Sequence, residues 1–125
     1  MAIYHFSGQI ISRSTSDGHI RSAVACAAYR SGEELFDERS QEKKCYERDV
    51  EPVTKILAPK NSPNWVYDRE LLWNEVEKVE KRYDAQLARE FNVALPNELT
   101  LEEQKKLAYE FCQKAFVDKG MVADI

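Results

Sequence analysis

The chain has 125 residues, of which 43% are hydrophobic and 32% charged, values that suit a single soluble globular domain. No apolar run approaches the roughly 20 residues needed to cross a bilayer, and the N-terminus lacks the pattern of a secretory signal. The three cysteines form no Cys-x-x-Cys pair, which excludes a disulfide framework and a zinc knuckle and favours a cytoplasmic protein. The net charge of −4 argues against a generally basic nucleic-acid-binding domain, although residues 1–32 carry a formal +2.

In chain order, we expect a first strand over residues 2–12 and then a polar loop. A run of small side chains with good helix propensity predicts a helix at about 20–30, ended by Gly32. Residues 37–44 are rich in charge and predict a solvated connection. Two short strands are expected near 44–48 and 53–58.

Asp68 is a good N-cap for a second helix. Apolar residues at helical spacing predict that its buried stripe consists of Leu72, Val76, Val79 and Tyr83. The outward face is then expected to carry Glu70, Glu77, Lys78 and Lys81.

A further strand is predicted over residues 89–95, with Phe91, Val93 and Leu95 on one face and Glu90 and Asn92 on the other. Thr100 and Glu103 form a capping-box pattern that predicts a third helix. Its buried stripe is expected to be Ala108, Phe111, Cys112 and Ala115, and residues 121–125 should begin another strand. This order predicts an α+β domain in which helices cover an antiparallel sheet.

Tyr29 is the residue most suited to chemistry, because Arg21, Tyr29 and Arg30 lie on or near one short helix. Tyrosine can attack a phosphorus atom and retain the nucleic acid as a covalent ester. Arginine is suited to holding a phosphodiester through paired hydrogen bonds. The ordinary alternative is a half-buried tyrosine that only packs at the end of an alanine-rich helix.

The whole sequence resembles the MobA/MobL family of plasmid-mobilisation relaxases, which nick one DNA strand at a transfer origin. Several motifs occur in the family's order, at residues 1–6, 12–14, 21–25, 28–33, 68–69, 72–74, 80–82, 84–85, 88–91 and 93–96. The resemblance implies a relaxase-like fold of the HUH endonuclease type, with a central antiparallel sheet between helices. It also implies that Tyr29 is the nucleophile and that a 5'-phosphotyrosine intermediate forms.

Such relaxases hold a divalent metal, for which Mg or Mn is expected here, through three histidines. The two histidines of this chain, His5 and His19, do not have the required spacing. A structural role is the simpler interpretation of His5, and His19 follows a turn signal. We therefore expect residues 1–125 to form the N-terminal part of a relaxase domain that is incomplete at its C-terminus and lacks the metal ligands. The resemblance places the partner of the final strand outside this chain.

The remaining site residues are expected to handle phosphate or orient other groups. Glu90 is a candidate for an orienting carboxylate, although a solvated glutamate at a strand edge is the ordinary alternative, and Asn92 replaces an acid of the family pattern. The expected DNA-binding residues are Ser12, Arg13, Ser14, Arg21 and Arg30.

Two functions of different class follow. The first is a metal-dependent, site-specific single-strand endonuclease and transesterase that starts conjugative mobilisation. Its partners would be single-stranded DNA at the transfer origin and accessory or coupling proteins of the relaxosome. The second is a non-catalytic module of the same scaffold that binds DNA or a mobilisation partner.

Overall fold

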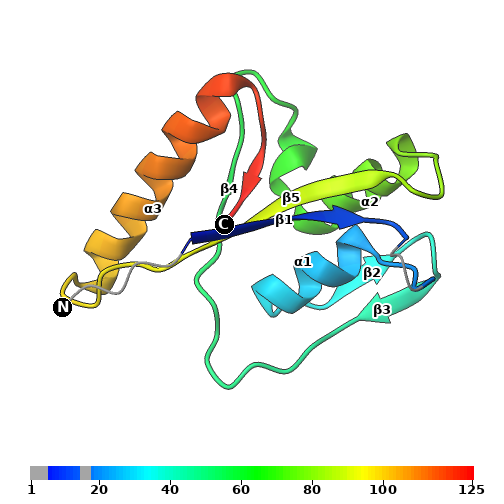
Figure 1. Cartoon of the computed structure of the whole chain (residues 1–125), viewed down its shortest axis with the longest axis horizontal. Coiled ribbons are helices and arrows are strands. Elements are labelled where there is room, and N and C mark those ends of the chain that lie inside the picture. Colours follow the sequence, from blue (N-terminus) through cyan, green and yellow to red (C-terminus); the bar gives the residue numbers. More distant parts are fainter. Residues whose placement is uncertain (1–5, 15–17) are drawn as a thin grey trace.

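The computed structural model describes residues 6–14 and 18–125. Helices and strands are interspersed along the chain, and the strands form three antiparallel pairs among the described residues (Figure 1). The elements are β1 (Phe6–Ser12), α1 (Ala23–Ser31), β2 (Leu35–Asp37), β3 (Glu42–Lys44), β4 (Ile56–Leu57), the 3-10 helix η1 (Asn64–Tyr67), α2 (Arg69–Val79), β5 (Gln86–Val93), α3 (Leu101–Ala115), the 3-10 helix η2 (Val117–Lys119) and β6 (Ala123–Asp124). The predicted strand that includes His5 extends outside the described residues.

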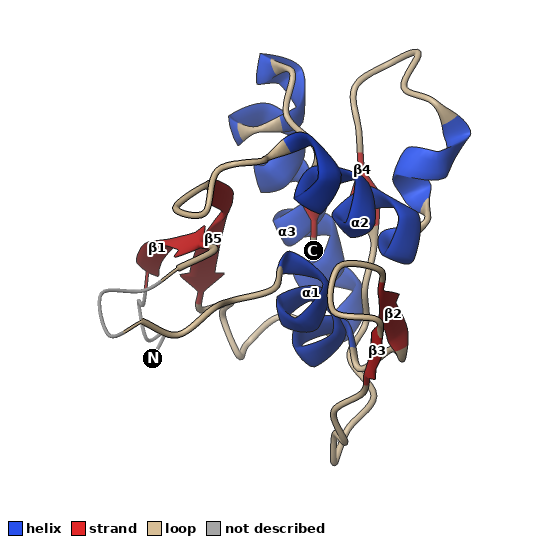
Figure 2. Ribbon diagram, turned by 90° about the vertical axis from the view of Figure 1, so that its right-hand side faces the viewer, coloured by secondary structure: helices blue, strands red, loops and turns tan. Residues whose placement is uncertain are grey.

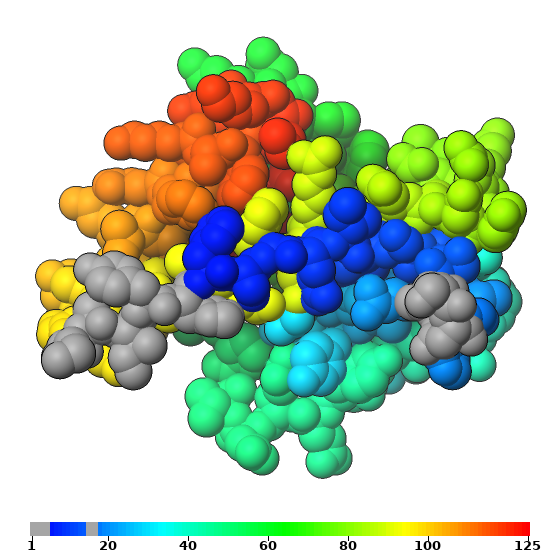
Figure 3. All heavy atoms as spheres, in the orientation of Figure 1, coloured from blue at the N-terminus to red at the C-terminus, as the bar shows by residue number. Residues whose placement is uncertain are grey.

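The long β1–β5 ribbon is the centre of the arrangement. Its strands are antiparallel, and the register shifts between Ile11 and Ser12. Figure 1 shows α3 on one side of the ribbon and α1 with the β2–β3 hairpin on the other. From a second direction, α1 again lies between the ribbon and the hairpin (Figure 2). The space-filling view shows β1 crossing this face of the molecule (Figure 3).

The helix α1 has well-formed ends, which explains its limits. The Ser22 side chain accepts a hydrogen bond from the Ala25 N–H, so the helix starts two to three residues later than expected. Gly32 ends it in the left-handed region at φ 75°, as its sequence position predicted. Val24 and Ala28 are completely buried, which fixes one face of α1 against the core.

The helix α2 confirms its predicted N-cap, since the Asp68 carboxylate accepts a hydrogen bond from the Leu71 N–H. The predicted apolar stripe is wrong in its second half, because Val79 is 70% and Tyr83 80% exposed. The helix stops at Val79, so Tyr83 no longer follows its periodicity. Glu77, expected on the outward face, is instead buried.

The solvated connection expected at 37–44 is a β-hairpin. Its β2 and β3 pair antiparallel, with Asp37 opposite Glu42. Asp37 is 1% exposed and accepts hydrogen bonds from the Arg39 N–H and the Ser22 hydroxyl, at 3.0 and 2.6 Å. A carboxylate satisfied in this way can close a tight turn inside the fold.

The helix α3 has the predicted capping box between Thr100 and Glu103. The predicted buried stripe is wrong, because no residue of α3 is buried and Phe111 is 44% exposed. The final strand also differs from expectation. It has a partner in this chain, since β6 pairs antiparallel with β4.

Trp73 joins the parts of the interior. Its ring packs against all three clusters of buried apolar side chains, one of which lies between α1 and β5 and another beside β4. Its indole N–H donates to Asp124 at 2.8 Å, which ties β6 to α2. Arg69 donates to the same carboxylate at 2.7 and 2.9 Å. Within the described residues, no helix is long and apolar enough to span a membrane.

Candidate functional site at the end of helix α1

Tyr29 lies in the last turn of α1 with 47% of its surface exposed. The ring of Tyr46 meets it edge-on, with the centroids 5.6 Å apart. The guanidinium carbon of Arg48 lies 4.2 Å from the Tyr29 ring centroid. The ring therefore packs against neighbours on the surface and stays open to a ligand.

Arg30 and Glu90 form an ion pair that joins the end of α1 to β5. Glu90 also accepts a hydrogen bond from the Gln9 side chain at 3.2 Å. The Arg30 side chain is 50% exposed, and its guanidinium carbon lies 5.6 Å from the Tyr29 ring centroid. The structure thus brings together three of the predicted site residues. Glu90 is a paired carboxylate, which differs from the ordinary alternative of a solvated strand-edge glutamate.

Arg13 is not part of this surface. It is 3% exposed, and its guanidinium donates to the Glu77 carboxylate at 3.0 Å and to the Arg82 carbonyl at 2.6 Å. Its Nε is buried and has no partner among the described residues. A guanidinium held in the interior in this way cannot meet DNA, so the structure gives Arg13 a structural role in place of the expected DNA contact.

Arg21 lies outside α1, before its N-cap Ser22, at the opposite end of the helix from Tyr29. It borders a hollow of about 360 Å³ lined by Ile20, Arg21, Ser22, Asp37, Arg39, Ser40 and Lys44. Lys44 pairs with Glu42 at 2.9 Å, so part of this positive charge is already neutralised. Ser12 and Ser14 are partly buried on the chain that leads into this region. The DNA-binding roles of Arg21, Ser12 and Ser14 stay predictions.

Sequence reasoning missed Tyr46 and Arg48. Arg48 is 19 residues from Tyr29, and its Nε donates to the Tyr29 carbonyl at 2.9 Å. No spacing rule connects the two positions. Gly32 is the sequence feature that relates to this contact. A Cβ at that position would lie 3.5 Å from the Arg48 Cγ and 3.2 Å from the Pro52 Cδ. A glycine at a helix end thus also permits the close passage of a later segment.

The described residues include no group of three His, Cys, Asp or Glu side chains placed to hold a metal ion. They do not fit the metal that the family resemblance implies, and that metal stays a prediction. The pKa of the Cys26 thiol on α1 depends on charged residues of the site. Its burial raises its pKa, with smaller effects from Arg21, which lowers it, and Glu90, which raises it.

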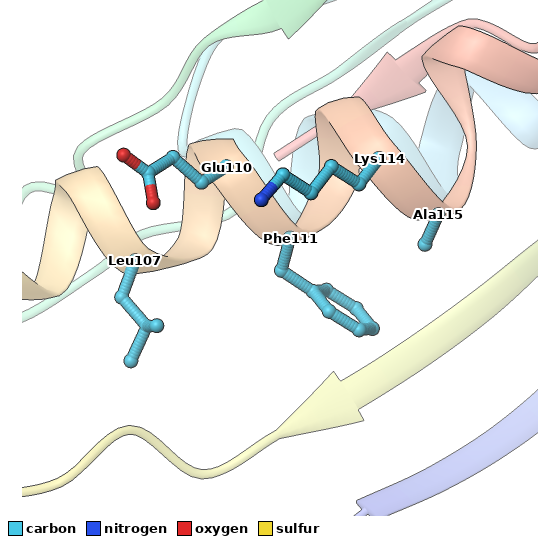
Figure 4. A pocket seen from close by; sticks show the side chains of 5 residues that line it. All are labelled: Leu107, Glu110, Phe111, Lys114 and Ala115. Atoms are coloured by element: carbon cyan, nitrogen blue, oxygen red, sulfur yellow. The ribbon is translucent and has the colours of Figure 1, made fainter.

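A second hollow, of about 420 Å³, runs along α3 (Figure 4). Leu107 and Phe111 project from the helix on the side where β5 runs. The lining also includes Glu110, Lys114 and Ala115. None of these lining residues is a tyrosine, so this hollow offers no counterpart of the Tyr29 phenol.

Comparison with known proteins agrees with this geometry. The MobA/MobL family model matches residues 21–125. The conjugal transfer protein TraA of Agrobacterium fabrum is 42% identical over 99% of this chain. The mobilization protein MobL of Acidithiobacillus ferridurans is 41% identical over the whole chain. The chain spans only 12% of the length of that TraA and 32% of that MobL.

A solved structure described as the molecular basis of vancomycin resistance transfer in Staphylococcus aureus has the same fold, with a TM-score of 0.89 and 35% identity. The match covers 98% of this chain and 61% of that one. The likeness confirms the α+β, relaxase-like fold expected from the sequence. The chain therefore belongs to the MobA/MobL family.

Proposed function

We propose that this chain carries the nucleophile of a DNA relaxase, which cuts one strand at a transfer origin and keeps it as a 5'-phosphotyrosine. The observation that supports this most is the position of Tyr29, a half-exposed phenol at a helix end with Arg30 and Arg48 at its ring. The TraA and MobL relatives support a role in conjugative transfer or mobilisation.

The proposed reaction is a transesterification. The Tyr29 oxygen bonds to phosphorus while the bond from phosphorus to the 3' oxygen breaks. The phenol loses a proton and the departing 3' oxygen gains one, so that a free 3'-hydroxyl is left. One phosphodiester is exchanged for another, and the reverse reaction can therefore rejoin the strand.

Arg30 and Glu90 have complementary roles in this proposal. The half-exposed guanidinium of Arg30 binds the phosphate backbone of single-stranded DNA. Glu90 keeps that guanidinium at the end of α1, because the carboxylate is itself held on β5 and bonded to Gln9. The pair therefore prepares a binding position before DNA arrives.

Other parts of the proposal rest on the family or on the sequence alone. A divalent metal, Mg or Mn, is expected in the complete enzyme, with ligands that the described residues do not supply. Relaxosome accessory and coupling proteins are the expected partners. A cytoplasmic location is predicted from the cysteine pattern.

The test uses the native gene product that carries this chain and a labelled single-stranded oligonucleotide of its transfer origin. With a divalent cation present, we expect a covalent protein–DNA adduct on a denaturing gel. Tyr29→Phe should abolish the adduct, and Tyr83→Phe, which changes an exposed tyrosine away from the site, should leave it unchanged. Mass spectrometry of the adduct then identifies the modified tyrosine.

The alternative is a non-catalytic module that binds DNA or a mobilisation partner. It gains support if the wild-type protein binds the oligonucleotide yet forms no adduct at any divalent cation concentration. An adduct that persists in Tyr29→Phe would instead assign the chemistry to another residue.

A further inference from the structure

Arg48 contacts both the backbone and the ring of Tyr29. Its Nε donates to the Tyr29 carbonyl at 2.9 Å, and its Nη2 donates to the same oxygen. Its guanidinium carbon also lies 4.2 Å from the centre of the Tyr29 ring. One side chain therefore holds both the backbone at the end of α1 and the ring of the proposed nucleophile.

The fold holds Arg48 in this position. Gly32 ends α1 at φ 75°, a conformation that other residues rarely adopt. A Cβ at Gly32 would lie 3.5 Å from the Arg48 Cγ and 3.2 Å from the Pro52 Cδ. The segment after β3 can therefore pass close over the helix end. Tyr46 in the same segment covers the edge of the Tyr29 ring.

Arg48 has unused capacity for a ligand. A guanidinium has five N–H donors, and two N–H groups here serve the Tyr29 carbonyl, which leaves three. The side chain is exposed, so these donors are open to solvent. Arg30 forms an ion pair with Glu90, whereas no carboxylate in the described part of the chain forms an ion pair with Arg48.

We propose that Arg48 binds the phosphodiester that Tyr29 attacks, and that it does so with the guanidinium donors not used by the Tyr29 carbonyl. This assignment rests on the proposed function. An anion that approaches the phenol oxygen comes close to a guanidinium that already lies over the ring. The positive charge then stabilises the charge that develops on the phosphate oxygens during attack.

The experiment compares Arg48→Ala and Arg48→Lys with Lys43→Ala, which removes an exposed charge from the neighbouring strand β3. The native gene product is used at saturating oligonucleotide, and the single-turnover rate of adduct formation is measured together with the Kd for DNA. A second oligonucleotide carries a methylphosphonate at the cleaved position, which removes the negative charge of that phosphate alone. Thermal unfolding of each variant reports on folding.

We expect Arg48→Ala to slow adduct formation on the ordinary oligonucleotide by about 100-fold, the size reported for removing one donor to a developing oxyanion. Arg48→Lys should retain part of the rate, because lysine keeps the positive charge but lacks the paired N–H donors of the guanidinium. Lys43→Ala should match the wild type. On the methylphosphonate, the difference between wild type and Arg48→Ala should largely disappear, because the charge that Arg48 binds is gone.

An equal loss on both oligonucleotides would overturn the assignment and reduce Arg48 to a support for the helix end. No change in the rate or the Kd would overturn it as well, and so would a change in the Kd that is equal on both oligonucleotides. If Arg48→Ala does not fold, the same comparison made with Arg48→Lys decides. Absence of any adduct from the wild type would instead remove the proposed function itself, and the assignment with it.

Discussion

Two arginine–glutamate ion pairs lie at the two ends of α1, and they differ in how far their side chains are buried. Arg13 and Glu77 lie near its start, with side chains 4% and 3% exposed. Arg30 and Glu90 lie at its end, with side chains 50% and 14% exposed. Both arginines come from the same positively charged N-terminal segment. The two pairs have the same residue types, so the sequence does not distinguish them. Burial does: it separates a structural arginine from one that is accessible to a ligand.

The buried pair acts as a hub for the fold. The Glu77 carboxylate accepts from Arg13 at 3.0 Å and from the Ala23 N–H, at the first turn of α1, at 2.7 Å. It thereby joins α2 to the start of α1 and to the residue that follows β1. A carboxylate at a helix N-terminus is also favoured by the helix dipole. The exposed pair makes no such connection to the interior. Its energy is reduced by solvent, and the half-exposed Arg30 guanidinium stays accessible.

The largest expected effect comes from breaking the buried pair. Glu77→Ala leaves the Arg13 guanidinium buried without its counter-ion, which is expected to lower the free energy of unfolding by about 3–5 kcal/mol. Chemical denaturation monitored by tryptophan fluorescence measures this change. Glu75→Ala, on the same helix but in an exposed pair with Lys78, is the control and should have a much smaller effect. Similar losses in the two variants would contradict the distinction between the pairs.

The burial of Glu77 could not be predicted from the sequence. Local signals predicted the starts of α2 and α3 and the end of α1, because Asp68, Thr100 and Gly32 act through bonds to their own turns. The buried face of α2 depends on a partner 64 residues away, the Arg13 side chain, and no local pattern contains that information.

The same limit applies to the site. The sequence predicts Tyr29 and Arg30 as site residues because they are adjacent in one helical run. It predicts Glu90 through strand alternation and the family resemblance. Arg48 was missed, since its contact with Tyr29 exists only after the chain has passed over Gly32. The hairpin at 37–44 was missed for a related reason. Asp37 is polar in sequence and yet buried, because the fold supplies it with three donors, from Ser22, Arg39 and Ser40.

The exposed pair should separate stability from function. Glu90→Gln removes the charge while keeping the shape, and because Arg30 is half-exposed the free energy of unfolding should change by less than about 1 kcal/mol. Adduct formation should slow by roughly tenfold, because Arg30 loses the group that orients it. Glu102→Gln, in an exposed pair with Lys105 on α3, serves as the control for loss of one surface charge. A loss of stability as large as that of Glu77→Ala would make Glu90 a structural residue.

The smallest expected effect uses Cys26 as a reporter that lies between the two pairs. Burial raises the pKa of this thiol above its ordinary value of 9.0; Arg21 and Arg30 lower it, and Glu90 and Glu77 raise it. Because the folded pKa lies above the unfolded one, the neutral thiol favours folding at lower pH. This contribution is complete below about pH 9 and is lost as the pH rises through the folded pKa.

Removal of the Glu90 charge should therefore lower the pKa of Cys26 and increase its thiolate fraction at a fixed pH near 9. Alkylation by iodoacetamide, followed for each cysteine by mass spectrometry, should be faster at Cys26 in Glu90→Gln than in the wild type. Arg21→Gln should have the opposite effect, because it removes a charge that lowers the pKa. The exposed Cys45 supplies an internal reference. Equal alkylation rates of Cys26 in the wild type and both variants would mean that neither charge affects the pKa of this thiol. The electrostatic role of Glu90 beside Arg30 would then lose its support.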